Sequence, residues 1–175
     1  MAINKMFFAG SGGQGILLMG QMIAKAAMNE NKEATFFPSY GPEMRGGTAN
    51  CTVVVSEHTI SSPVIFESDF VVAMTLPSMN KFESTLKPGG ILMLNKSLIP
   101  QAPKRTDIKV IEVPVTELSN DLGNAKVANI IMLGAFVRAA NIVLSESVEQ
   151  IIRETFVGKF ASLLELELEA YHLWK

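Results

Sequence analysis

The chain has 175 residues, 48% of them hydrophobic, which is enough for one domain with a sizeable core. Its formal net charge of -2 gives no reason to expect binding to nucleic acid, and no apolar run approaches the roughly 20 residues that span a bilayer. A single cysteine, Cys51, excludes a disulfide framework, a Cys-rich zinc site or an iron–sulfur cluster held by this chain alone, and indicates the cytoplasm.

The N-terminal part predicts a strand, a glycine turn and a helix. The apolar residues 6–9 predict the strand, and residues 16–31 follow with helical periodicity, in which small residues would let the helix lie close on a sheet. Between them the sequence reads Gly10-Ser11-Gly12-Gly13-Gln14-Gly15, which fits the G-x-G-x-x-G spacing. Such a turn offers glycine backbone and helix N–H groups to an anion, so it predicts a contact with a phosphate-bearing ligand.

The second predicted strand, residues 33–37, completes a β-α-β unit with a right-handed parallel crossover. A dinucleotide-binding domain usually has an acidic residue at the end of this strand, where it holds the ribose hydroxyls. Here the strand ends in Phe37-Pro38-Ser39, and the acid Glu33 lies at its start. An NAD(P) site is therefore disfavoured.

Residues 38–50 predict a long structured loop with two prolines, three glycines and one cation, Arg45. A guanidinium suits phosphate and carboxylate groups, so we interpret Arg45 as an anion or partner contact. The alternative is a surface cation or an ion pair with Glu43.

The rest of the chain predicts alternating strands and helices, then helices alone. Cys51 lies in a predicted central strand and reads as a small core residue. Asn129, inside a helix that is apolar nearly all round, needs a partner, either structural or functional. The acidic run at 165–169 predicts a solvated helix face, and the apolar C-terminus predicts docking on the core or a subunit interface. The expected strands are 48–56, 59–65, 69–74, 91–94 and 108–113 (an edge strand), and the expected helices are 77–86, 115–122, 126–141 and two within 145–175.

These elements predict an α/β fold over residues 1–175: one three-layer α/β/α domain with a Rossmann-like first β-α-β unit and a helical C-terminal third. The sheet is expected to be mostly parallel, with a mixed sheet as the alternative.

Two motifs together carry a family resemblance. The turn at residues 10–15 and the loop Ser39-Tyr40-Gly41-Pro42-Glu43-Met44-Arg45-Gly46-Gly47 resemble the gamma subunit, or gamma domain, of 2-oxoacid:ferredoxin oxidoreductases. The likeness continues through residues 49–51, 60–63 and 129–135, so it covers nearly the whole chain. The tyrosine–arginine–glycine loop is the more specific of the two motifs.

The resemblance implies a place in a multi-subunit enzyme. Members of this family oxidatively decarboxylate a 2-oxoacid to an acyl-CoA and pass the electrons to ferredoxin. Thiamine diphosphate and the iron–sulfur clusters lie in alpha, beta and ferredoxin-like partner subunits, whereas the gamma domain is associated with coenzyme A and with assembly. By this resemblance the chain is a non-catalytic subunit whose glycine turn and following loop would face CoA or the catalytic subunits. The expected CoA-binding residues are Gly12, Gly13, Gln14, Gly15, Ser39, Tyr40 and Arg45.

The resemblance also bears on the substrate. Pyruvate-type gamma subunits often carry a basic residue where this chain has Ser11, which favours 2-oxoglutarate over pyruvate or 2-oxoisovalerate. Two alternatives remain from the residues themselves: an independent NAD(P)-binding reductase, supported by the glycine turn, and a purely structural assembly module.

Overall fold

The computed structural model describes residues 3–39 and 47–175. The chain as far as β6 consists of the strands with α1 and α2 among them, and helices follow. In chain order the elements are β1 (Ile3–Ser11), α1 (Ile16–Asn29), β2 (Glu33–Ser39), β3 (Thr48–Ser56), β4 (Ser68–Ala73), α2 (Leu76–Phe82), the 3-10 turn η2 (Glu83–Thr85), β5 (Leu86–Asn95), β6 (Lys109–Val113), α3 (Val115–Asp121), the 3-10 turn η3 (Ala125–Val127), α4 (Ala128–Ala140), α5 (Ser145–Thr155), the 3-10 turn η4 (Gly158–Leu163) and α6 (Leu164–Leu173).

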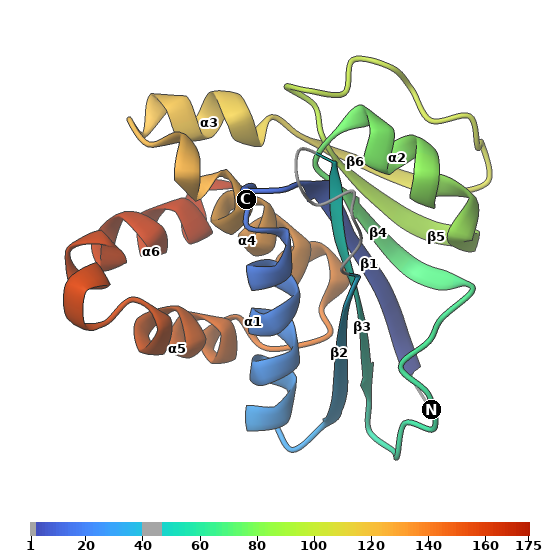
Figure 1. Cartoon of the computed structure of the whole chain (residues 1–175), viewed down its shortest axis with the longest axis horizontal. Helices are drawn as coiled ribbons and strands as arrows, with labels where there is room; N and C mark the ends of the chain where they lie inside the picture. The colour runs from blue at the N-terminus through green and yellow to red at the C-terminus, as the bar shows by residue number, and fades with distance from the viewer. Residues whose placement is uncertain (1–2, 40–46) are drawn as a thin grey trace.

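In the described part of the chain, six strands form one sheet in the order β2-β3-β1-β4-β5-β6 (Figure 1). Strands β1, β4, β5 and β6 run parallel, whereas β3 is antiparallel to both of its neighbours, β1 and β2. The predicted α/β fold with a mostly parallel, mixed sheet is confirmed. Strand β6 lies at an edge, as its alternating sequence predicts.

Strand β3 splits the predicted first β-α-β unit. Helix α1 does connect β1 to β2, but β3 takes the place beside β1 and keeps the two strands apart. Strand β3 runs antiparallel to β2 and fills the hydrogen-bonding edge of β1 that a simple β-α-β unit would give to β2. The Rossmann likeness therefore extends only to strand, turn and helix.

Apolar side chains cover both faces of the sheet. Helices α1 and α4 pack on one face, with α5 and α6 outside them, and α2 packs on the other face (Figure 1). The ring of Phe136 in α4 stands edge-on to Phe8 and Phe70, at centroid distances of 5.2 and 5.6 Å. On the α2 face, Phe7 and Phe82 pack at 4.9 Å. These contacts join helices to strands that are distant in sequence.

Helix α1 lies close on the sheet, as its small residues predict. A side chain at Gly20 would overlap the sulfur of Cys51 in β3, so only glycine permits this approach. Cys51 is fully buried, and burial raises the pKa of its thiol to about 12. Its interpretation as a core residue is confirmed.

The C-terminal helix docks on the core through Tyr171, which is fully buried. Arg138 of α4 donates from Nη2 to the Tyr171 carbonyl at 2.9 Å, and the Tyr171 hydroxyl lies 3.2 Å from the Ser145 hydroxyl. Gly134 leaves room for this contact, because a side chain there would overlap the Tyr171 backbone. Within residues 3–39 and 47–175, no helix is long and apolar enough to cross a bilayer.

Two local predictions are wrong. Residues 59–65 form no strand, because the chain bends there: the Ser62 hydroxyl accepts the Val64 amide. Helix α2 ends at Phe82, and β5 already begins at Leu86, where it pairs with Ser68 at the start of β4.

Glu167 departs from the solvated face predicted for residues 165–169. It lies among the buried residues of α6 and is 6% exposed, and its Oε2 has no hydrogen-bond partner among the described residues. Burial raises the pKa of the Glu167 carboxyl to about 7. The acid is therefore largely protonated in the folded protein below neutral pH.

This burial predicts a pH-dependent stability that Glu167→Gln removes. Between its ordinary pKa of 4.5 and about 7, the folded state holds a proton that the unfolded chain has released. The free energy of unfolding should therefore fall with rising pH by up to about 1.4 kcal/mol per unit in that window. Urea unfolding from pH 4.5 to 8 should show a flatter slope for Glu167→Gln. The exposed Glu165→Gln is the control, and equal slopes in all three proteins would contradict the prediction.

Candidate functional site

The glycine turn between β1 and α1 is held by a close contact with α4. Gly15 has a left-handed φ of 72° at the N-cap of α1, and a side chain there would overlap the amide of Asn129. Asn129 is 5% exposed, and its Nδ2 lies 3.5 Å from the Gly15 carbonyl. The buried amide of Asn129 thus has a structural partner for its Nδ2 in the Gly15 carbonyl. Its Oδ1 has no hydrogen-bond partner among the described residues.

Several backbone amides of the turn already have partners. The Ser11 amide donates to Oε1 of Gln14 at 2.7 Å, and the Gln14 amide returns a bond to the Ser11 carbonyl at 3.2 Å. The Gly12 amide donates to the Gly47 carbonyl at 3.3 Å, which ties the end of the following loop to the turn. These three amides are engaged within the protein, so a ligand at the turn would have to contact other groups of the turn.

Beside the turn lies a hollow of about 240 Å³. It is formed where the parallel strands β1, β4, β5 and β6 end, together with the start of α4. Ligands of open α/β sheets bind at this carboxyl edge. The lining residues are Gly13, Gln14, Met74, Leu98, Thr116, Ala125, Lys126 and Ala128.

The lining combines an apolar surface with a few polar groups. Met74 and Leu98 supply apolar side chains, whereas Gln14 and Thr116 supply an amide and a hydroxyl. Lys126 is exposed and adds a positive charge, and none of these eight described residues is acidic. The hollow is therefore suited to an anionic ligand with an apolar portion.

The structure brings only some of the predicted site residues together. Gly13 and Gln14 line the hollow, and Gly12 and Gly15 flank them in the same turn. Ser39 ends β2, in register with Asn50 and through it with Ala9 of β1. It is thus two strands away, about 10 Å by ordinary strand spacing, and it does not line the hollow.

Tyr40 and Arg45 lie outside the described residues. Their proposed contacts therefore remain predictions.

Sequence reasoning missed the far side of the hollow. Met74, Leu98 and Thr116 follow β4, β5 and β6, and Lys126 precedes α4. The available signal was position: each of the first three comes shortly after a parallel strand ends.

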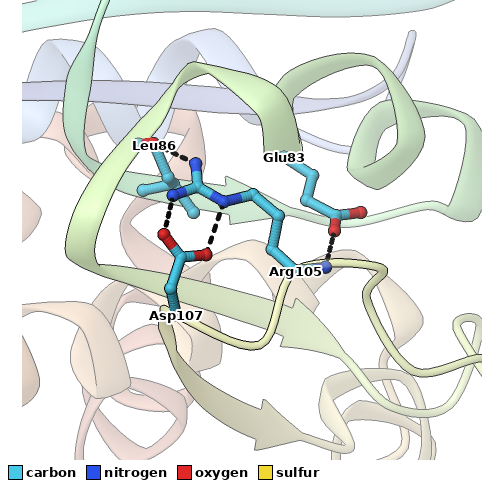
Figure 2. Close-up of polar contacts among 4 residues, drawn as sticks. All are labelled: Glu83, Leu86, Arg105 and Asp107. Carbon is cyan, nitrogen blue, oxygen red and sulfur yellow. Dashed lines mark hydrogen bonds and ion pairs between the residues drawn. The ribbon is translucent and has the colours of Figure 1, made fainter.

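The connector from β5 to β6, which carries Leu98, is clamped at its far end (Figure 2). Arg105 forms a two-pronged ion pair with Asp107, with Nε to Oδ1 at 2.8 Å, and its Nη1 donates to the Leu86 carbonyl. The Arg105 amide donates to the buried carboxylate of Glu83 at 2.6 Å. The Arg105 guanidinium lowers the pKa of Asp107, so the pair persists in mildly acidic solution.

The histidines are peripheral. His58 is exposed, and His172 pairs with Glu149 at 3.2 Å on the surface of α6. Among residues 3–39 and 47–175 no group of three or more His, Cys, Asp or Glu side chains is arranged to hold a metal ion.

Comparison with protein families gives one match over nearly the whole chain. The family described as "Pyruvate ferredoxin/flavodoxin oxidoreductase" matches residues 5–173. Ketoisovalerate oxidoreductase subunit VorA of Methanothermobacter marburgensis is 38% identical over 86% of this chain, and the chain spans about a third (32%) of that relative's length. 2-Oxoglutarate synthase subunit KorC of Methanocaldococcus jannaschii is 36% identical over 84% of this chain and 80% of its own length.

Solved structures share the fold. The keto/oxoacid ferredoxin oxidoreductase gamma subunit of Geobacter sulfurreducens superposes with a TM-score of 0.84 at 30% identity, covering 97% of this chain and 95% of its own. A chain of the 2-oxoglutarate:ferredoxin oxidoreductase of Magnetococcus marinus, solved with 2-oxoglutarate, coenzyme A and succinyl-CoA, gives a TM-score of 0.89 at 21% identity. That match covers 98% of this chain and 30% of the larger one.

The contact between Gly15 and Asn129 predicts that Gly15→Ala destabilises the fold more than Gly13→Ala. Both positions have positive φ, which costs a non-glycine residue about 1–3 kcal/mol, but a side chain at Gly13 meets open space. Only Gly15→Ala must also push Asn129 out of place. Urea unfolding of the two variants measures the difference, and equal losses would contradict this account of the turn.

Proposed function

This chain belongs to the pyruvate ferredoxin/flavodoxin oxidoreductase family, and we propose that it is a gamma-type subunit of a 2-oxoacid:ferredoxin oxidoreductase. Residues 1–175 would form one gamma-type domain in a cytoplasmic complex that decarboxylates a 2-oxoacid to an acyl-CoA and reduces ferredoxin. Its partners would be alpha and beta subunits that bind thiamine diphosphate and a ferredoxin-like subunit. The chain itself would contribute to CoA binding and to assembly.

The chemistry of this chain supports a non-catalytic role. Iron–sulfur clusters are held by several thiolates, and this chain has one thiol, buried in β3, whose pKa is raised to about 12. Cys51 is therefore neither a cluster ligand nor a nucleophile. These residues do not fit a cluster, so the electron-transfer groups belong to partner subunits.

The observation that carries the CoA role is the hollow at the carboxyl edge of the sheet. It places Lys126 beside the glycine turn and above an apolar surface, which suits a ligand with phosphate groups and an apolar arm. At about 240 Å³ it would hold only part of CoA, and partner subunits would hold the rest. We assign Gly12, Gly13, Gln14 and Gly15 to this site. Ser39 at the end of β2, with Tyr40 and Arg45 after it, would contact the part of CoA that extends beyond the hollow.

We propose 2-oxoglutarate as the 2-oxoacid. Ser11 at the glycine turn and the KorC relative support this choice, although the VorA relative and a pyruvate synthase subunit, PorC, at 32% identity are similar too. The purified complex should be assayed with 2-oxoglutarate, pyruvate and 2-oxoisovalerate. A higher kcat/KM for either of the other acids would overturn the choice.

A second candidate is a purely structural assembly module. The amides of Ser11, Gly12 and Gln14 favour it, because they are engaged within the protein and not offered to a ligand. The two candidates differ in whether CoA binding depends on the hollow.

A charge variant in the assembled complex separates them. Lys126→Ala should raise the KM for CoA roughly three- to tenfold, because a charge-assisted contact with a phosphate is lost, and should leave kcat at saturating CoA unchanged. Lys25→Ala removes an exposed lysine from the middle of α1, away from the hollow, and serves as the control. If both variants keep the wild-type KM for CoA, the structural module is the better account.

A further inference from the structure

We propose that Asn95 is a positioning residue for this hollow: it orients the hydroxyl of Thr116 so that the hydroxyl donates to a phosphoryl oxygen of the bound CoA. The inference rests on the proposed CoA role and adds two residues to it. Asn95 is the last residue of β5 and is fully buried, whereas Thr116 lines the hollow from the first turn of α3.

Asn95 ties together three walls of the hollow. Its Nδ2 donates to the hydroxyl oxygen of Thr116 at 2.9 Å and to the carbonyl oxygen of Met74 at 3.4 Å. The backbone carbonyl of Asn95 accepts a hydrogen bond from the backbone amide of Leu98 at 3.1 Å. Met74, Leu98 and Thr116 follow three different parallel strands, so one buried residue holds all three, Met74 and Thr116 through its side chain and Leu98 through its backbone.

The surroundings decide which way the amide of Asn95 points. Its Oδ1 accepts the amide of Ser97 at 3.2 Å, while its Nδ2 faces the Met74 carbonyl. A flipped amide would put oxygen against the Met74 carbonyl and nitrogen against the Ser97 amide, so both contacts would become repulsive. The donor therefore faces Thr116.

This orientation determines the role of the Thr116 hydroxyl. An amide nitrogen donates only, so the Thr116 oxygen must accept from Asn95, which leaves its proton to donate elsewhere. The backbone of Thr116 is held as well, because its carbonyl accepts the buried Ser119 hydroxyl at 2.9 Å. The Thr116 hydroxyl in the lining of the hollow is therefore oriented to act as a hydrogen-bond donor.

A donor hydroxyl and an ammonium group select the same kind of ligand atom. Thr116 and Lys126 line one hollow, and a phosphoryl oxygen accepts from both. The network continues to the glycine-turn side of the sheet, where the Met74 amide donates to the Ala9 carbonyl of β1 at 2.8 Å. The positions of the turn and of Thr116 are therefore coupled through Met74 and Asn95.

Steady-state kinetics of the assembled complex test the proposal. Thr116→Val should raise the KM for CoA about five- to tenfold with kcat at saturating CoA within about twofold of wild type, and Thr116→Ser should restore the KM. Asn95→Asp replaces the donor by an acceptor, which draws the Thr116 proton away from the hollow, so it should raise the KM similarly. The variant that combines Thr116→Val with Asn95→Asp should have a KM for CoA no higher than that of the more severe single variant, because both changes remove the same hydrogen bond to CoA.

A matched control separates positioning from stability. Ser68 is also buried, at the start of β4 and so at the end of the strand away from the hollow, and its hydroxyl is hydrogen-bonded to Thr85. Ser68→Ala should therefore lower the melting temperature without changing the KM for CoA. An unchanged KM in the Thr116→Val or Asn95→Asp complex, while Lys126→Ala still raises it, would overturn this inference and leave the proposed function standing. If Ser68→Ala raises the KM equally, the effect is one of stability and the inference is also overturned. If Lys126→Ala has no effect either, the CoA role itself fails.

Discussion

Four parallel strands end at one edge of the sheet, and the backbone groups that they leave there need partners. A line of hydrogen bonds across this edge supplies them: the Met74 amide bonds to the Ala9 carbonyl, and the Asn95 side chain bonds to the Met74 carbonyl and to Thr116. The glycine turn closes the β1 end, where Gly15 fits against α4 only because it has no side chain. The hollow is the space that these contacts leave between the turn, the strand ends and α4.

The proposed function requires little reactive chemistry of this chain. Its thiol is buried against α1, and its histidines lie at the surface. Among the described residues, the lining at the edge where ligands of α/β sheets bind offers backbone groups, the Gln14 amide, the Thr116 hydroxyl and the Lys126 ammonium group. Such a surface suits the proposed role, in which this chain would position part of a substrate for groups on other subunits.

The sequence predicted elements with strong local signals and missed contacts made in three dimensions. The first strand, glycine turn and helix follow from an apolar run, the spacing of the glycines and helical periodicity, and the buried α4 follows from its apolar sequence. Pairing of β3 with β1 has no local signal, because it depends on which strand fills an open edge. The contact between Asn95 and Thr116 likewise spans 21 residues. In α6, alternating leucine and glutamate cannot show that Glu167 is the acid that faces inward.

Hydrogen exchange of the assembled complex, with and without CoA, tests the central claim most directly. The account predicts slower exchange in peptides that contain Gly13 to Leu17, Thr116 and Lys126, because the ligand would cover the turn and the start of α3 and α4. Protection confined to partner subunits, with these three regions unchanged at saturating CoA, would contradict it.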